Sequence, residues 1–394
     1  MTVAMASRAV QADAAHRQRT VLFVVNAAWF FLSHRLPLAR AARENGYDVH
    51  VLTDVSTPGE AEALSREGLT VHHARIARGS INPFGDLRFI LRAMRVMRLV
   101  APALVHNVTV KPVLYGTLAA RLVGAPCIVN AISGFGYAFS HESRWLLATV
   151  LRTAYGLVLR SPRVRVIFQN DDDAHEFQGA GLVSAEQSVL IRGSGVDLAR
   201  FSPGPEDPAA PPLVVLAARM LRDKGVGEFV AAARLLRERG CAARMVLAGP
   251  LDESNPAALT RAELETLTSA AHVQWLGQVD EMPELYRRAH IVCLPSYREG
   301  LPKSLIEACA AAKPIVTTDV PGCRAVVADR VNGLLVPARD ALALADALEM
   351  LINDAPLRAR FGAAGRVRAE REFAIGSVVR QTMELYARAL AANR

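Results

Sequence analysis

Short apolar runs of strand length alternate with helix-length segments along nearly the whole chain, and this alternation constrains the fold more than any other feature. The strand-like runs lie at 20–25, 47–53, 69–76, 102–108, 127–133 and 164–170, and then at 212–219, 243–249, 273–277, 290–296 and 313–319. Most of the segments between them are rich in Ala, Arg, Leu and Glu. Such alternation is the signature of βαβ units and parallel sheets. The sequence therefore predicts an α/β protein.

The chain divides most naturally at residues 193–212, where Gly and Pro cluster and the periodicity vanishes. We therefore predict two Rossmann-like domains, at 20–200 and 201–372. Residues 1–19 are expected to be a flexible leader, and residues 373–394 a C-terminal helix that crosses back to the first domain. Ligands of open α/β sheets bind at the carboxyl ends of the strands, so two such domains facing each other would create one deep cleft.

The composition is that of a globular protein with an ample core, because 51% of the residues are hydrophobic and 21% are charged. The five cysteines lack CxxC or Cys/His ligand spacing, which favours reduced thiols in a cytosolic protein without a structural metal. The leader lacks the apolar core of a signal peptide. No apolar run approaches the roughly 20 residues that cross a bilayer, so no transmembrane segment is expected.

Basic residues exceed acidic ones, with 46 Lys and Arg against 38 Asp and Glu. This excess suits an anionic membrane surface, nucleic acid or phosphorylated substrates, and charge alone does not choose among them. Two segments, 86–100 and 143–165, combine arginines with apolar residues. They predict either helices that lie in an anionic membrane interface or ordinary helices with a solvated basic face.

Two carboxylates lie around the start of a predicted helix near Ser304. Glu299 precedes this helix and Glu307 lies within it. The helix start offers free N–H groups and a dipole to an anion, so the carboxylates can bind the two ends of a nucleotide sugar with its diphosphate between them. A capping Glu and a solvated helix Glu are the open alternative. The predicted donor-binding residues are Gly300, Leu301, Pro302, Lys303 and Glu307.

A second group of chemistry-bearing residues follows the strand at 212–219. Arg219 leaves the strand tip and Lys224 follows after a short turn. Both cations can converge on a diphosphate without the help of a metal. An Arg/Lys pair at a strand end is also common on protein surfaces, so the prediction depends on its combination with Glu299 and Glu307.

Four stretches together resemble the donor domain of the retaining glycosyltransferases of family 4, which have the GT-B fold. They are "RMLRDKG", "AGP", "GQVDEMPELYRRAHIVCLPSYREGLPKSLIEACAAAKPIVTTDVPGC" and "NGLLVP". In the first half, "FFLSHRLPLARAARENGYDVHVLT", "RGSINPFGDL" and "SGFGYAF" further resemble a bacterial branch that extends undecaprenyl-diphosphate-linked glycans. That branch includes the N-acetylgalactosaminyltransferases of protein N-glycosylation. The resemblance covers almost the whole chain.

The resemblance implies a role for each matching residue. Arg219 and Lys224 would hold the donor diphosphate and stabilise the leaving nucleotide. Glu299 would contact the transferred sugar, Glu307 the ribose, and the amides of Gly300 and Leu301 the sugar or phosphate. Together with His106, the residues Arg219, Lys224 and Glu299 form the predicted catalytic set.

The first half departs from the family pattern in several places. Many relatives carry two histidines after the fourth strand, whereas here His106 is followed by Asn107 and Val108. His106 is therefore either a catalytic or a core histidine, and Lys111 is an alternative contact for acceptor phosphate. In the second half, Ala325 stands after Arg324 where relatives often have Glu.

The segment after the first strand supplies the other candidate acceptor-binding residues. Ser33, His34 and Arg35 would start the following helix and face the cleft, with Arg35 meeting an acceptor diphosphate. The alternative is a capping Ser followed by solvated His and Arg. The loop from Ser133 to Phe139 interleaves glycines with aromatic residues. It would either cover a lipid or acceptor, or pack in the core.

Two further patterns are set aside. Asp171 to Asp173 imitate a metal-binding DxD motif, but they follow a strand at a predicted helix start, where acidic residues favour the helix dipole. The first strand is not followed by GxGxxG, so a dinucleotide site is not predicted.

These observations predict a retaining, metal-independent glycosyltransferase. It would move a hexose or N-acetylhexosamine from a UDP-sugar to a glycan acceptor, in the favoured case a polyprenyl-diphosphate-linked saccharide at the inner face of the cytoplasmic membrane. No cofactor, metal or nucleic-acid partner is expected. A 2-epimerase of UDP-N-acetylhexosamine on the same fold and a non-catalytic nucleotide-sugar-binding module remain the alternatives.

Overall fold

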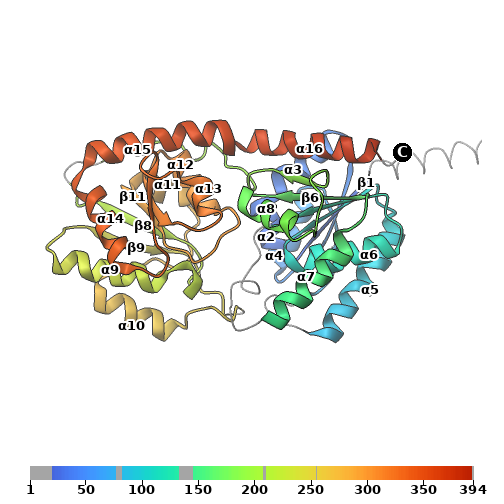
Figure 1. The fold of residues 1–394 in the computed structure, drawn as a ribbon, viewed down its shortest axis with the longest axis horizontal. Helices are drawn as coiled ribbons and strands as arrows, with labels where there is room; N and C mark the ends of the chain where they lie inside the picture. The colour runs from blue at the N-terminus through green and yellow to red at the C-terminus, as the bar shows by residue number, and fades with distance from the viewer. Residues whose placement is uncertain (1–19, 77–81, 133–144, 207–209, 254, 393–394) are drawn as a thin grey trace, which may run out of the picture. The chain divides into compact units, whose positions relative to one another are not determined.

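The computed structural model describes residues 20–76, 82–132, 145–206, 210–253 and 255–392. By its internal contacts the chain forms two compact units, shown in Figure 1. Unit 1 comprises Met1–Ile191 and Val379–Arg394, and unit 2 comprises Arg192–Val378. The leader at 1–19 and the loop from Ser133 to Phe139 lie outside the described residues.

The described part of unit 1 contains a sheet of seven parallel strands in the order β3-β2-β1-β4-β5-β6-β7. The strands are β1 (Thr20–Val25), β2 (Asp48–Thr53), β3 (Thr70–His73), β4 (Leu104–Val108), β5 (Cys127–Ala131), β6 (Val164–Phe168) and β7 (Ser188–Leu190). The central strands β1, β4 and β5 are buried along their whole length. Their mainly apolar sequences, in which Val, Leu and Ile predominate, suit a parallel sheet that is covered on both faces.

Helices of unit 1 connect these strands. They are α2 (Ala28–His34), α3 (Leu36–Glu44), α4 (Pro58–Arg66), α5 (Pro83–Val100), α6 (Thr117–Leu122), α7 (Trp145–Leu159) and α8 (Asp171–Gly179), with a π-helical turn η1 (Pro112–Gly116) before α6. Local sequence sets several of their starts. Thr57 and Glu60 form a capping box at α4, and the Asn82 side chain accepts from the Gly85 N–H at α5.

The described part of unit 2 contains a sheet of six parallel strands in the order β10-β9-β8-β11-β12-β13. The strands are β8 (Leu213–Ala217), β9 (Arg244–Ala248), β10 (Gln274–Trp275), β11 (Ile291–Leu294), β12 (Ile315–Thr318) and β13 (Gly333–Val336). The connecting helices are η4 (Arg222–Lys224), α9 (Val226–Glu238), α10 (Arg261–Ala271), α11 (Met282–Arg288), α12 (Lys303–Ala310), α13 (Cys323–Val326), α14 (Ala341–Asn353), α15 (Ala355–Arg368) and η5 (Ala369–Phe373). Both predicted parallel sheets are thus confirmed.

The last helix, α16 (Ile375–Ala391), begins in unit 2 and ends in unit 1. Its buried residues include Val378, Leu385, Tyr386 and Ala389. The part from Val379 onward belongs to unit 1, so this unit is assembled from two separate stretches of sequence.

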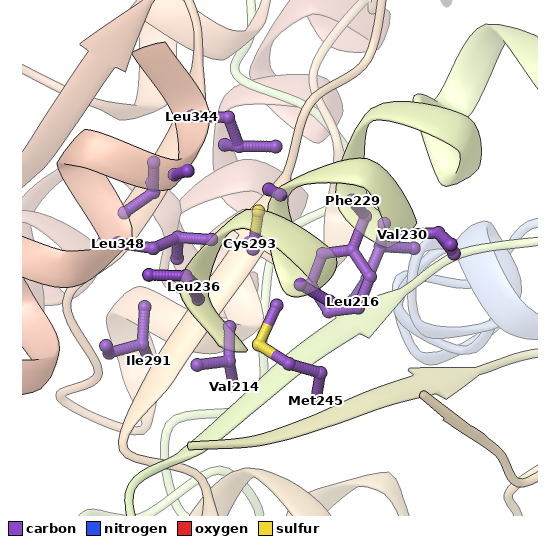
Figure 2. Close-up of a cluster of buried hydrophobic side chains, with 14 of the residues drawn as sticks. Val214, Leu216, Phe229, Val230, Leu236, Met245, Ile291, Cys293, Leu344 and Leu348 are labelled. Carbon is purple, nitrogen blue, oxygen red and sulfur yellow. The ribbon is translucent and has the colours of Figure 1, made fainter. Parts of the chain in front are cut away.

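A hydrophobic core packs α9 and α14 onto one face of the unit 2 sheet, as Figure 2 shows. Val214 and Leu216 of β8 lie with Phe229 and Leu236 of α9, and Leu348 of α14 belongs to the same cluster. All five side chains are almost fully buried. Burial of such side chains contributes about 1.5–3 kcal/mol each to the stability of the folded state.

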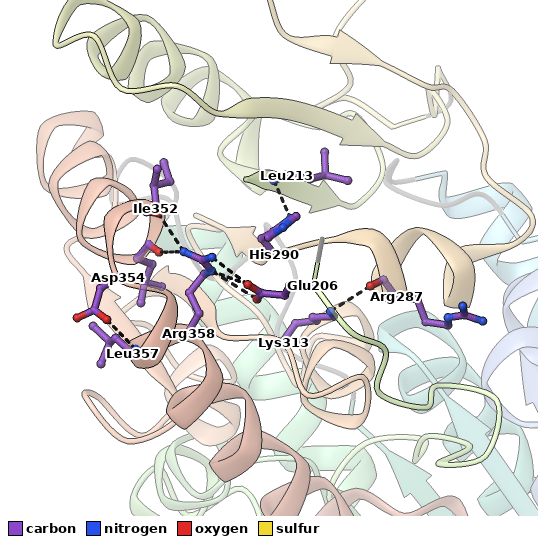
Figure 3. Close-up of polar contacts among 10 residues, drawn as sticks. Glu206, Leu213, Arg287, His290, Lys313, Ile352, Asp354, Leu357 and Arg358 are labelled. Atoms are coloured by element: carbon purple, nitrogen blue, oxygen red, sulfur yellow. Dashed lines mark hydrogen bonds and ion pairs between the residues drawn. The ribbon is translucent and has the colours of Figure 1, made fainter. Parts of the chain in front are cut away.

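Polar contacts fix the amino end of the unit 2 sheet (Figure 3). Buried Arg358 of α15 binds Glu206 at 2.9 Å and donates to the carbonyls of Leu351 and Ile352. His290, just before β11, accepts a hydrogen bond from the N–H of Leu213. The amino end is therefore occupied by structural contacts, which leaves the carboxyl ends of the strands for a site.

Both sheets have a topological switch point. The strand order reverses between β1 and β4 in unit 1 and between β8 and β11 in unit 2. The connections that follow two such strands diverge to opposite faces of the sheet and leave a crevice at the carboxyl ends. In unit 2, Arg219 and Lys224 follow β8, and Glu299 follows β11.

Candidate functional site

The switch point of unit 2 brings together cations and carboxylates from two loops. Arg219 follows β8, and Lys224 ends the short 3-10 turn η4. Glu299 lies in the loop after β11. The Lys224 Nζ lies 2.5 Å from the Glu299 Oε1, and the Ser296 hydroxyl donates to the same oxygen at 2.7 Å. Lys224 and Glu299, two of the predicted site residues, are thus in direct contact within one unit.

Gly225 allows the two loops to approach each other. Its φ of 73° lies in the left-handed region, and a Cβ at this position would collide with the carbonyl group of Pro295. The neighbouring N–H of Tyr297 donates to the Asp223 carbonyl at 2.9 Å. Because only glycine combines this conformation with this contact, the sequence Asp-Lys-Gly fixes where Lys224 sits.

Asp223 is a site residue that the sequence reasoning missed. Burial raises the pKa of its carboxyl group; Lys224 and Arg219 oppose this rise, and Glu299 adds to it. One carboxylate oxygen, Oδ1, is buried without a hydrogen-bond partner among the described residues. The electrostatic coupling places all four groups close to one another, so an incoming anion would meet two cations that already hold carboxylates.

Arg219 is held by Asp252, a second residue that the sequence reasoning did not single out. Its Nη1 binds the Asp252 Oδ2 in a close ion pair, while the Arg219 side chain stays partly exposed. The Asp252 loop can lie beside Arg219 because Gly249, at the end of β9, packs on the carbonyl of Ala218. Nη1 makes this contact and the Arg219 side chain is 37% exposed, so part of the guanidinium can face a ligand.

The start of α12 forms the second part of the candidate site. No side chain caps this helix, and its first residue is Lys303, preceded by Pro302. Glu307 is buried, and the Lys303 Nζ lies 3.6 Å from its Oε1. Burial raises the pKa of Glu307 to about 6, against the opposing effect of Lys303. Among the other predicted donor residues, Leu301 is buried in the hydrophobic core, and the carbonyls of Glu299 and Gly300 lie against Gly322.

Arg35 and His106 lie in the core of unit 1, which corrects the sequence prediction for both. Helix α2 ends at His34, and Arg35 lies between α2 and the start of α3 at Leu36. Both side chains are buried, and the His106 Nδ1 forms a close hydrogen bond with the hydroxyl of Tyr386 from α16. Burial lowers the pKa of Arg35 to about 10 and that of His106 well below its usual range. These positions support the core alternative for His106 and leave Arg35 without access to an acceptor.

The other candidate acceptor residues of unit 1 are engaged within the protein. Ser33 and His34 end α2 and do not start a helix as predicted; the Ser33 Oγ lies 2.6 Å from the His34 Nδ1. The Lys111 Nζ binds the buried carboxylate of Asp86 at 2.7 Å, and the Tyr115 hydroxyl donates to the same carboxylate. Lys111 would therefore have to share or leave Asp86 in order to bind phosphate.

The acidic run that imitates a DxD motif lies at a helix start, as predicted. Asp171 to Asp173 open α8, and the Asn170 side chain caps it by accepting from the Asp173 N–H at 2.8 Å. Over the parts of the chain that the structure describes, no cluster of His, Cys, Asp and Glu has the makings of a metal site. None of the described helices has both the length and the apolar character that a bilayer crossing requires.

Comparison with known families covers both units. The family described as "Glycosyl transferases group 1" matches residues 201–368, and the family "Glycosyl transferase 4-like" matches residues 20–170. Together the two matches account for most of the chain. The first contains Arg219, Lys224, Glu299 and Glu307.

Individual proteins show the same relationship. The N,N'-diacetylbacillosaminyl-diphospho-undecaprenol alpha-1,3-N-acetylgalactosaminyltransferase of Campylobacter jejuni is 28% identical over 350 residues, 83% of this chain and 90% of that protein. The capsular polysaccharide biosynthesis glycosyltransferase CapM of Staphylococcus aureus is 23% identical, over 90% of this chain and 94% of its own.

Solved structures show the fold. Sucrose-phosphate synthase from Thermosynechococcus elongatus superimposes with a TM-score of 0.77 at 20% identity, over 95% of this chain and all of that one. Anabaena HepE in complex with UDP-glucose gives a TM-score of 0.73 at 19% identity, over 93% and 99% of the two chains. With two parallel Rossmann-like sheets and both family matches, the chain belongs to the group 1 glycosyltransferases and has the GT-B fold.

Proposed function

We propose that this glycosyltransferase moves a hexose or N-acetylhexosamine from a UDP-sugar to a glycan acceptor, with retention at the anomeric carbon and without a metal. The acceptor we favour is a polyprenyl-diphosphate-linked saccharide used for bacterial surface glycans or glycoproteins. The observation that carries this proposal is the contact of Lys224 with Glu299 at the switch point of unit 2, where Arg219 acts with both on the carboxyl group of Asp223.

In the proposed reaction, the bond between the anomeric carbon and the diphosphate oxygen breaks, and negative charge grows on the leaving diphosphate. Arg219 and Lys224 would stabilise this charge, together with the uncapped start of α12 at Lys303. Preorganised cations and N–H groups of this kind usually supply the largest part of enzymatic rate enhancement. Two side-chain cations would do the work that a metal ion does in other transferases.

The carboxylates would orient the sugars. Glu299, fixed by Lys224 and Ser296, would accept hydrogen bonds from hydroxyls of the transferred sugar. Glu307 would accept from the two hydroxyls of the ribose. The acceptor hydroxyl would form the new bond to the anomeric carbon on the face that the diphosphate leaves, and its proton would pass to an oxygen of the departing phosphate.

The names of similar proteins support the choice of substrates. The Campylobacter relative is named for an undecaprenyl-diphosphate-linked acceptor, and the Staphylococcus relative for capsular polysaccharide synthesis. The Anabaena neighbour is described with UDP and with UDP-glucose. An acceptor of the polyprenyl-diphosphate class would bring the enzyme to an anionic membrane surface, at the inner face of the cytoplasmic membrane.

Acceptor-dependent release of UDP tests the proposal. The purified protein is incubated with a panel of UDP-sugars, with and without lipid-diphosphate saccharides, and the products are identified by mass spectrometry. We expect UDP release to require an acceptor, one glycosylated product, an α-linkage from an α-linked donor by NMR, and little change after EDTA treatment. Isomerisation of the donor sugar without acceptor would identify an epimerase instead, and donor binding without turnover on any acceptor would identify a binding module.

A further inference from the structure

The outer side of one helix layer in unit 1 is apolar. Helices α5, α6 and α7 pack on one face of the sheet and share a hydrophobic core with it (Figure 1). Along α5, Phe84, Leu87 and Leu91 recur at helical spacing with exposed fractions of 84%, 53% and 57%. Leu122 of α6 and Leu157 of α7 are exposed as well. Such a concentration of large apolar side chains in one layer indicates a binding surface.

The charges of this layer have one sign. Arg88, Arg95 and Arg98 of α5 are exposed, and within the described residues none of them forms an ion pair or side-chain hydrogen bond. The sequences of α5, α6 and α7 contain one acidic residue, Asp86, which is buried and bound to Lys111. The exposed side of α5 is therefore cationic as well as apolar.

Unit 2 shows how an outer helix layer on a similar sheet is built when it faces water. Arg234 pairs with Glu238 along α9 at 3.6 Å. Arg239, at the end of α9, binds Glu349 of α14 at 2.6 Å. Mixed ion pairs of this kind are missing from the exposed side of α5, as far as the described residues go. In the same layer, Arg152 of α7 pairs with Glu176 of α8 at 3.5 Å. The single sign of charge on α5 is thus a property of this helix and not of the fold.

We propose that the α5–α7 layer, defined by these three helices, docks on a membrane that contains anionic phospholipid. The proposal rests on the proposed function, because a polyprenyl-linked acceptor keeps its chain in a bilayer. A surface that is anionic outside and apolar inside matches unpaired arginines beside exposed Phe84 and Leu91. Nucleic acid would pair with the arginines but would leave the apolar stripe in water.

Helix α5 supplies the main contacts of this layer. Arg160 and Arg165, which follow α7, donate to the carbonyls of Gly181 and Pro162 at 3.1 and 2.7 Å. Their orientation is set by the protein, as is that of Arg92, which donates to the His73 carbonyl at 3.2 Å. Arg88, Arg95 and Arg98 have no such contact within the described residues and can turn toward lipid phosphates. Docking should therefore depend more on α5 than on the residues after α7.

Co-sedimentation of the full chain with vesicles tests the proposal. The vesicles are phosphatidylcholine alone or an equimolar mixture with phosphatidylglycerol, at low and high salt. We expect binding to the anionic vesicles that weakens with salt. The variant Arg88→Glu/Arg95→Glu should bind at least about 30-fold more weakly, since each basic residue contributes about fivefold. Circular dichroism verifies that each variant is folded.

A matched pair of variants controls for net charge. Arg237→Glu/Arg360→Glu changes the same charge on exposed residues of unit 2 and should leave binding nearly unchanged. For the apolar part, Phe84→Ser/Leu91→Ser should weaken binding at high salt, whereas Leu342→Ser/Met350→Ser on exposed sites of unit 2 should not. Equal losses in the α5 variants and their controls would overturn the proposal.

Two further outcomes would also overturn it. One is no binding to anionic vesicles even at low salt. The other is a concentration-dependent dimer in analytical ultracentrifugation that Leu91→Ser dissociates, because a second copy would then be the occupant. The tests separate this proposal from the function. Transfer to water-soluble acceptors without vesicle binding would overturn only the proposed docking surface. Vesicle binding without transfer to any acceptor would overturn only the proposed function.

Discussion

Arg219 and Lys224 each hold a carboxylate in this structure, and both are proposed to hold the donor diphosphate. We expect Arg219→Ala or Lys224→Ala to lower kcat by about 30- to 1000-fold, because each loses about 2–4 kcal/mol of charge stabilisation in the transition state. The control is Arg222→Ala, which removes an exposed arginine of the same loop that pairs with Glu263. Single variants that are folded and retain near-normal turnover would show that the donor site lies elsewhere.

Asp252 is expected to orient Arg219. In Asp252→Asn the carboxylate charge is lost but the size is kept, so the guanidinium should lose its fixed direction. We expect kcat to fall about tenfold with a smaller change in donor KM, since orientation matters most as charge develops. Asp252→Glu should recover part of the activity. If Asp252→Asn instead binds UDP more tightly with unchanged kcat, Asp252 competes with the donor and does not position Arg219.

If Glu307 binds the donor as proposed, donor binding should depend on pH. Burial raises its pKa to about 6, so the carboxylate is protonated below that pH and ionised above it. The ionised form is the better acceptor for ribose hydroxyls, so UDP affinity should fall as pH drops through about 6 and level off above it. Isothermal titration across this range measures the effect. In Glu307→Gln the affinity should be lower throughout and should lose this step, and a step that persists in the variant would assign it to another group.

The sequence could predict those candidate site residues whose position in the fold is restricted by their neighbours in the chain. Lys224 lies before a glycine that must adopt a left-handed turn, and Glu299 lies between a buried strand and a helix start. Asp223 lies in the same motif, but no neighbouring residue marks it as part of a site. Asp252 lies in a loop after another strand. Their roles depend on contacts across 33 residues or more, between loops whose relative positions no local pattern defines.

At the scale of secondary structure, the sequence predicts every described strand except β7, with three residues, and β13, with four. β13 begins with a glycine, a residue that is depleted in strands. The start of α2 was misplaced for a different reason: Ala27 caps it without a side-chain hydrogen bond, so no capping residue marked Ala28.

The contact between α15 and the segment before β8 should support unit 2. Arg358 is buried and holds both Glu206 and the carbonyls at the end of α14 (Figure 3). We expect Arg358→Ala to lower the free energy of unfolding by about 3 kcal/mol, because the carbonyls and Glu206 lose a charged donor. Urea unfolding followed by circular dichroism measures this. Arg360→Ala, on the exposed side of the same helix, is the control, and equal stabilities of the two variants would contradict the prediction.

At the scale of the whole molecule, α16 belongs to both units. We expect Tyr386→Phe to lower the free energy of unfolding by about 1–2 kcal/mol, because the buried His106 would lose its hydrogen-bond partner. Differential scanning calorimetry of the variant and of Arg388→Ala, an exposed residue of the same helix, measures the effect. A loss confined to the transition that contains unit 2 would show that the tyrosine does not support unit 1.

The order in which the chain leaves the ribosome gives this arrangement a consequence for synthesis. Domains usually complete their folding in sequence order as they emerge. Here unit 2 is one continuous stretch, whereas unit 1 includes Val379–Arg394 at the end of the chain. Unit 1 begins to be translated first but can complete its folding only last. Its buried His106 forms a hydrogen bond with Tyr386, which is synthesised after the whole of unit 2. In a purified chain truncated after Val378, unit 2 should accordingly resist protease while unit 1 is still readily cleaved.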